Sequence, residues 1–122
     1  MALIPKQAAR DKTRSVVREL TVLNEFGLHA RTVARFVRCA MNFRSEIHIV
    51  ASGRRYLGIS IMGILVANLN QGAKFTIIAE GPDAEIAVET LELLLAHFAE
   101  EEDLQKEVSL DRKERNREAP DF

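Results

Sequence analysis

The chain has 122 residues, of which 47% are hydrophobic, so it can form one domain with a modest core and is short for two domains. Its formal net charge of -1 argues against a sequence-independent nucleic-acid binder. One cysteine excludes an internal disulfide and paired-cysteine zinc sites. We find no apolar run that could cross a membrane and no secretory leader, so we expect a cytoplasmic protein without membrane insertion, metal or cofactor.

Charge is concentrated at the two ends of the chain. Residues 1–18 carry five basic side chains and one acidic one, whereas residues 100–122 carry nine acidic and five basic ones. The middle of the chain is nearly neutral. This distribution predicts a globular domain at 18–99 between two extensions. The basic N-terminal extension is 1–17, and the charged C-terminal extension is 100–122, expected to be helical at first and then disordered.

The first half of the domain alternates between strand and helix patterns. Residues 18–24 have the two-residue period of a half-buried strand, which ends before Gly27. From Ala30 the apolar residues follow the spacing of a helix. Residues 46–50 alternate again, and a Ser-Gly turn predicts that 54–57 returns as a hairpin partner. The apolar positions of this predicted helix are Val33, Phe36, Val37 and Ala40.

The second half repeats the alternation. Residues 60–69 are almost all apolar, so their pattern is compatible with either a helix or a buried strand. Ser60 is a good N-cap residue, which favours the helix. A strand at 74–80 and a turn ending in the N-cap Asp83 precede a longer helix. The order βαββαβα predicts an α+β fold: an open-faced sandwich of a four-stranded antiparallel sheet covered on one face by three helices.

His29 is the principal candidate for chemistry, because it lies where the first strand ends and the first helix begins. The first turn of a helix has unpaired backbone N–H groups and a partial positive charge, which together stabilise an anion. A neutral imidazole is nucleophilic and titrates near physiological pH. Arg31 can add charge-assisted hydrogen bonds to a phosphoryl group. From the spacing alone, a histidine without a role is an equally good interpretation.

Two blocks of sequence resemble the HPr family of histidine phosphocarriers, including its nitrogen-branch relatives. Residues 24–31 (NEFGLHAR) are similar to the family's active-site signature, and residues 60–64 (SIMGI) are similar to a second family segment. The turns at 70–72 (NQG) and 79–81 (AEG) also match. The resemblance covers roughly residues 18–99, and it rests on separate motifs at the family's spacing.

The resemblance implies a role for each matching residue. His29 would be phosphorylated at ring Nδ1, with Arg31 as its charged neighbour. Ser60 would match a serine that a dedicated HPr kinase modifies, and Ile61, Met62 and Leu65 would form an apolar docking patch. The function implied is that of a carrier, not an enzyme, which accepts a phosphoryl group from enzyme I, ultimately from phosphoenolpyruvate, and passes it to EIIA-type acceptors. HPr kinase/phosphorylase is a further candidate partner.

Two positions depart from the family pattern. Thr32 stands where the family has proline, which puts the stability of a phosphohistidine in doubt. Ile59 stands where lysine or asparagine is usual, which puts phosphorylation of Ser60 in doubt. His48, on the outer face of a strand, and His97, near the end of the last helix, are interpreted as structural.

Two other functions are compatible with the sequence. A regulatory adaptor on the same fold would dock partners without carrying phosphate, although His29 argues against it. A ferredoxin-like binding module shares the order βαββαβ, but the strands lack a paired aromatic signature for RNA. The sequence distinguishes neither the acceptor nor a sugar-uptake branch from a nitrogen-regulatory branch.

Overall fold

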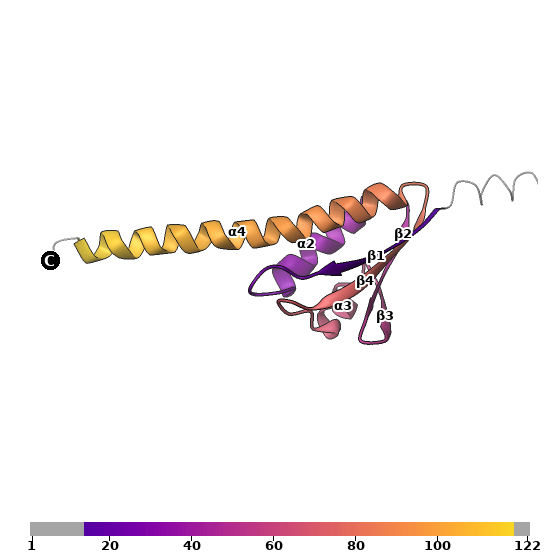
Figure 1. Ribbon diagram of the computed structural model, residues 1–122, viewed down its shortest axis with the longest axis horizontal. Helices are drawn as coiled ribbons and strands as arrows, with labels where there is room; N and C mark the ends of the chain where they lie inside the picture. Colours follow the sequence, from indigo (N-terminus) through magenta and orange to yellow (C-terminus); the bar gives the residue numbers. More distant parts are fainter. Residues whose placement is uncertain (1–13, 119–122) are drawn as a thin grey trace, which may run out of the picture.

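The computed structural model describes residues 14–118 (Figure 1). Most of the predicted basic extension therefore lies outside the described residues. The observed order of elements is βαββαβα, as predicted. The elements are β1 (Arg14–Thr21), α2 (Ala30–Ala40), β2 (Glu46–Ala51), β3 (Arg54–Leu57), α3 (Ile61–Ala67), β4 (Lys74–Gly81) and α4 (Ala84–Glu118).

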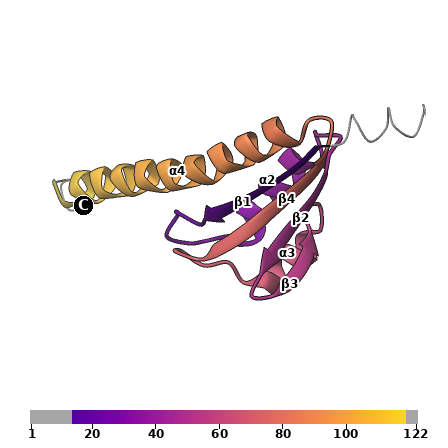
Figure 2. The ribbon, with the colours of Figure 1, turned by 45° about the vertical axis from the view of Figure 1, so that its right-hand side comes forward.

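The four strands form one antiparallel sheet in the order β1-β4-β2-β3. Alternate residues of β4 pair with the apolar residues of its neighbours: Phe75 lies opposite Leu20, and Ile77 lies opposite Ile49. Because the side chains of a strand alternate between the two faces, these pairs put one apolar surface on one side of the sheet. The helices cover that side (Figure 2), which confirms the predicted open-faced architecture.

The core consists of this apolar sheet face and the stripes of α2 and α4. All four apolar positions predicted for α2 are buried. In α4, one apolar stripe is buried except Leu94, which is only partly covered at the edge of the core. The buried members of that stripe are Ala87, Val88, Leu91, Leu95 and Phe98.

The first strand begins at Arg14, not at residue 18 as predicted. Val16 pairs with Ala79 and is partly buried against the core. Arg18 lies on the helix side of the sheet, where its Nη1 is 2.9 Å from Oε1 of Glu92 in α4. Residues 14–17 therefore form part of the sheet, because their backbone completes the pairing with β4.

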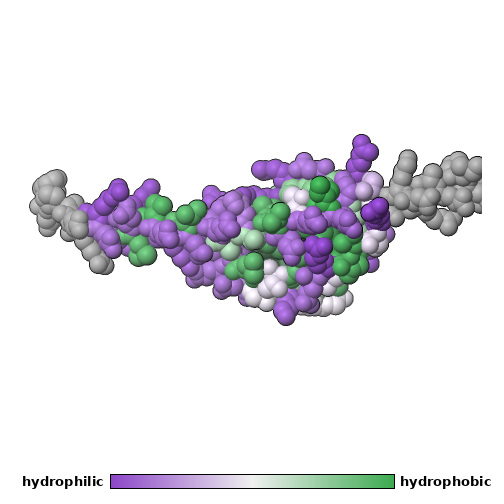
Figure 3. All heavy atoms as spheres, turned by 45° about the horizontal axis from the view of Figure 1, so that its top comes forward, coloured by the Kyte–Doolittle hydropathy of each residue, from purple (hydrophilic) through white to green (hydrophobic). Residues whose placement is uncertain are grey.

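The last helix is one element of 35 residues. The predicted boundary at residue 99 falls inside it, and the part described continues to Glu118 beyond the domain (Figure 1). His97 therefore lies in the middle of α4 and not near its end as predicted. Its Nε2 is 2.7 Å from Oε1 of Glu101, one turn further on. The projecting part of α4 is mostly hydrophilic, with isolated apolar side chains (Figure 3).

Asp83 lies at the predicted N-cap position of α4, and its side chain links two parts of the fold. Its carboxylate accepts hydrogen bonds from the backbone N–H groups of Arg44 and Ser45, both at 2.9 Å. The Ser45 hydroxyl also donates to it, and this hydrogen bond is the main cause that lowers the pKa of Asp83 below its usual value. The carboxylate thus ties the turn after α2 to the start of α4.

Candidate functional site

The segment that precedes His29 is a tight turn. Asn24 is 1% exposed, and its side-chain Nδ2 donates to the Gly27 carbonyl at 2.9 Å. The Gly27 N–H donates to the Asn24 carbonyl at 3.1 Å, and the Leu28 N–H donates to the Leu69 carbonyl at 2.8 Å. Gly27 has φ +67°, and a Cβ there would lie 2.7 Å from the Leu69 carbonyl oxygen. Only glycine fits this position without strain, so the conformation of the turn depends on Gly27.

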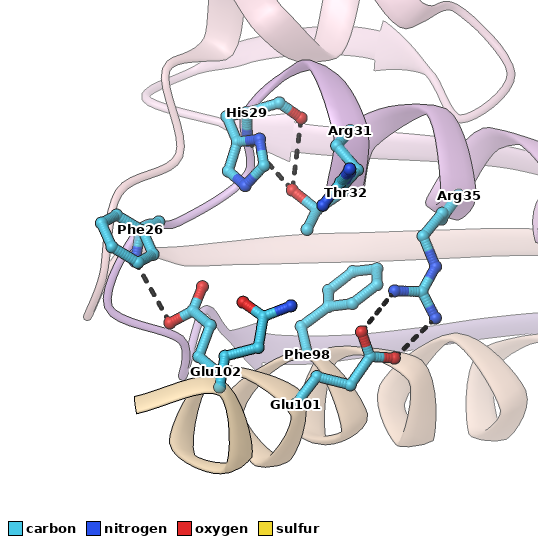
Figure 4. Close-up of a pocket in the computed structure, with 9 residues that line it drawn as sticks. Phe26, His29, Arg31, Thr32, Arg35, Phe98, Glu101 and Glu102 are labelled. Atoms are coloured by element: carbon cyan, nitrogen blue, oxygen red, sulfur yellow. Dashed lines mark hydrogen bonds and ion pairs between the residues drawn. The ribbon is translucent and has the colours of Figure 1, made fainter. Parts of the chain in front are cut away.

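His29 occupies the N-cap position of α2 in extended conformation, without a side-chain cap hydrogen bond. Thr32, in the first turn of α2, stabilises the start of this helix. Its buried Oγ1 accepts a hydrogen bond from the His29 N–H at 3.0 Å (Figure 4). The same hydroxyl lies 3.2 Å from the carbonyl oxygens of Gly27 and His29, to either of which it can donate. The exposed imidazole is therefore free for chemistry while its backbone is held in place.

The His29 side chain shares a pocket with charged residues of α2 and α4 (Figure 4). Arg35 forms a bidentate ion pair with Glu101, with N–O distances of 2.7 and 2.8 Å. Its guanidinium also lies 5.0 Å from the centre of the Phe98 ring. The hydrogen bond from Arg35 lowers the pKa of Glu101, and the same bond raises the pKa of Arg35. The residues that line the pocket are Phe26, His29, Arg31, Thr32, Arg35, Phe98, Glu101, Glu102 and Gln105.

Glu102 contacts the turn directly. Its Oε2 accepts a hydrogen bond from Asn24 Nδ2 at 2.7 Å, and its Oε1 accepts one from the Glu25 N–H at 2.7 Å. The Phe26 N–H is 3.4 Å from the same Oε1. One turn further along α4, Lys106 pairs with the Glu25 carboxylate, and this hydrogen bond is the main cause that raises the pKa of Lys106.

The second motif lies at the start of α3, apart from this pocket. Ser60 is the N-cap of α3, and its Oγ accepts a hydrogen bond from the Gly63 N–H at 3.0 Å, as predicted. Met62 is 72% exposed and Ile61 is 42% exposed, whereas Leu65 is partly buried against the core. Two of the three predicted docking residues, Ile61 and Met62, are therefore exposed to solvent, and Leu65 exposes a smaller surface.

The structure brings His29 and Arg31 together in one pocket and adds residues that sequence reasoning missed. The hydroxyl role of Thr32 was hidden because that position was interpreted only as a departure from proline. The pairing of Arg35 with Glu101 was not predicted, because nothing in their spacing indicates that α2 and α4 run side by side. Glu102 lies in a run of four acidic residues, 100–103. The sequence does not indicate which of these four makes the most hydrogen bonds.

Two further features are absent from the described part of the chain. Within residues 14–118 no helix is both long and apolar enough to cross a membrane. The same residues contain no group of three potential metal ligands.

Comparison with known proteins identifies the fold and the motifs together. The family described as "PTS HPr component phosphorylation site" matches residues 16–97. The phosphocarrier protein HPr of Cupriavidus necator is 36% identical over 80 residues, which cover 66% of this chain and 90% of that protein. The HPr of Treponema pallidum is 37% identical over 87 residues, 71% of this chain and 99% of that protein.

A solved structure gives the same result. The crystal structure of HPr from Bacillus anthracis superposes with a TM-score of 0.64 at 38% identity, covering 66% of this chain and 95% of that one. The family match spans both the turn with His29 and the segment with Ser60. This chain therefore belongs to the HPr family of phosphocarriers of the phosphotransferase system.

Proposed function

We propose that His29 is the residue of this phosphocarrier that accepts a phosphoryl group from enzyme I and passes it to an EIIA-type acceptor. The observation that carries the proposal is the exposed, uncapped imidazole at the N-terminus of α2, backed by the Thr32 hydroxyl. The Nδ1 lone pair forms the new bond to phosphorus as the bond to the donor breaks, and the donor keeps that bonding pair. Transfer to the acceptor is the same step with the roles exchanged.

The local charges favour a phosphoryl group at this position. The first-turn N–H groups of α2 and the Arg31 guanidinium offer positive potential beside the ring. The nearby acid Glu101 is compensated by Arg35 at 2.7 Å, so part of the negative charge in the pocket is already neutralised. The site is therefore electrostatically suited to a phosphoryl dianion.

The start of α3 is proposed as the docking surface for both partners. Ile61 and Met62 are exposed apolar side chains on a helix that packs against α2, and Leu65 extends the patch toward the core. Exposed apolar patches of this kind mark protein–protein contacts. Ser60 borders the patch, and its phosphorylation by an HPr kinase would place negative charge beside the docking residues.

The test is incubation of the full chain with enzyme I and phosphoenolpyruvate, followed by intact mass measurement. We expect a gain of one phosphate that is lost in acid and is absent in His29→Ala. The matched control is His97→Gln, which removes another histidine on the helix side of the sheet and should still gain phosphate. An unmodified wild-type chain would refute the carrier function and favour the adaptor, and a phosphorylated His29→Ala would place the phosphate elsewhere.

A further inference from the structure

The C-terminal part of α4 touches the active-site turn, although it lies outside the residues that match the family. The family match ends at residue 97, and Glu102 follows one turn later on the same helix. In the fold, α4 runs beside α2 and continues past the turn that joins β1 to α2 (Figure 1). Glu102 and its contacts therefore lie beyond the residues that the family model matches.

The Glu102 carboxylate satisfies groups that the turn cannot satisfy by itself. The buried Asn24 amide directs its two N–H bonds toward Gly27 O and Glu102 Oε2, at 2.9 and 2.7 Å. The N–H of Glu25 points out of the turn and is met by Glu102 Oε1 at 2.7 Å. Hydrogen bonds to an ionised carboxylate are stronger than those between neutral groups, so Glu102 fixes both the side chain and the backbone at the beginning of the turn.

This turn also fixes the position of the His29 backbone. The Asn24 amide holds the Gly27 carbonyl, and that carbonyl is one of the groups within reach of the Thr32 hydroxyl, which accepts from the His29 N–H. A continuous set of hydrogen bonds thus runs from Glu102 to the backbone of the phosphorylatable residue. Small displacements of a reacting group slow a transfer step strongly. We propose that Glu102 is a positioning residue for phosphoryl transfer at His29, acting through Asn24 and the Glu25 amide.

The inference rests on the proposed function and predicts a specific pattern of kinetics. Enzyme I should phosphorylate Glu102→Ala with kcat lowered by about tenfold and KM nearly unchanged, because the transfer geometry loosens while the α3 surface is untouched. Glu102→Gln should recover part of the rate, since its carbonyl oxygen can still accept from the Glu25 N–H. The matched control is Glu107→Ala, which removes the same charge from an exposed position of α4.

A second measurement follows the turn itself in the unphosphorylated full chain. Amide hydrogen exchange of Glu25 should be about tenfold faster in Glu102→Ala than in wild type or Glu107→Ala, while the amides of β4 stay protected. Unchanged transfer in Glu102→Ala, or equal losses in Glu107→Ala, would overturn the inference while leaving the carrier function in place. A wild-type chain that gains no phosphate on His29 would refute both together.

Discussion

The two helix starts that carry the family motifs use their N-cap residues in different ways. At α3, the Ser60 side chain itself caps the helix, because its hydroxyl accepts a hydrogen bond from the Gly63 N–H. At α2, the His29 side chain makes no cap hydrogen bond, and the Thr32 hydroxyl stabilises the helix start instead. The two starts therefore differ in which N–H is satisfied: at α3 it is an N–H of the first turn, and at α2 it is the N–H of the N-cap residue itself.

The two starts also differ in what surrounds them. The turn before α2 is backed by Asn24, Thr32 and the Glu102 carboxylate from the far end of the chain. The start of α3 is flanked by the exposed side chains of Ile59, Ile61 and Met62. One site is hydrogen-bonded and charged, which suits group transfer, and the other is apolar and accessible, which suits docking.

The largest expected effect is a difference in stability between alanine substitutions of Gly27, before α2, and Gly63, in α3. Gly27→Ala forces a side chain into the left-handed region and to within 2.7 Å of the Leu69 carbonyl oxygen, so we expect a loss of about 3 kcal/mol in the free energy of unfolding. A Cβ at Gly63 would lie 3.0 Å from Ser60 Oγ and 3.3 Å from Ser60 Cβ, without a left-handed backbone. The gain in helix propensity of Gly63→Ala therefore offsets the crowding to within about 1 kcal/mol. Urea denaturation of both variants gives the comparison, and equal losses would contradict it.

The next effect tests whether the Thr32 hydroxyl stabilises the start of α2. Thr32→Val keeps the shape but removes the acceptor of the His29 N–H in a position only 6% exposed. We expect a loss of about 1–2 kcal/mol. The control is Thr90→Val, because the Thr90 hydroxyl bonds only to the Ile86 carbonyl of its own helix. If both variants unfold at the same urea concentration as wild type, the capping role of Thr32 is refuted.

The apolar character of the α3 surface is tested by a charge. Met62→Asp places a carboxylate in the proposed docking patch, and we expect binding to enzyme I to weaken by about 1 kcal/mol or more, because the charge is desolvated on docking. The fold should remain intact, since Met62 is 72% exposed. Calorimetric titration measures the affinity, and Leu93→Asp, at a similarly exposed position of α4, is the control. A stable Met62→Asp with normal affinity would remove this surface from the docking proposal.

A smaller effect concerns the cap of α3. Ser60→Ala removes the acceptor of the Gly63 N–H and should lower the free energy of unfolding by about 1 kcal/mol, while affinity for enzyme I is kept. Ser60→Asp should keep the melting temperature within a few degrees and lose affinity, because a carboxylate can still cap the helix but adds charge to the patch. If an HPr kinase leaves the wild-type chain unmodified, Ser60 is a cap only and the regulatory proposal is wrong.

The periodic parts of the sequence predicted the fold, and the contacts between distant charges could not be predicted. Alternation in β4 and the stripe of α2 identified buried faces because burial repeats with the period of each element. Glu102 and Arg35 obey no such period, since their roles depend on where α4 passes in space. The motif predicted His29 as the site, and the folded structure adds that the Thr32 hydroxyl accepts from its N–H.

The smallest effect is a dependence on pH that only the α2 site should show. The hydrogen bond from Arg35 holds the pKa of Glu101 below its ordinary value of 4.5, assisted by the charges of Arg35, His97 and Arg31 and opposed by burial. A lowered carboxyl pKa contributes stability above the ordinary value, and this contribution is lost as the pH falls through the folded-state pKa. By contrast, α3 has no titratable side chain in Ile61–Ala67.

The measurement compares melting temperatures of wild type and Glu101→Gln between about pH 5 and pH 2.5, where an ordinary histidine stays protonated. Wild type should be slightly the more stable at the upper end, since the pair is about one-third exposed and is screened by salt. The difference should vanish at the lower end, where Glu101 is protonated and pairs with Arg35 no better than glutamine does. Glu107→Gln should show no such convergence. A constant difference across the range would mean that Glu101 acts through packing and not through its charge.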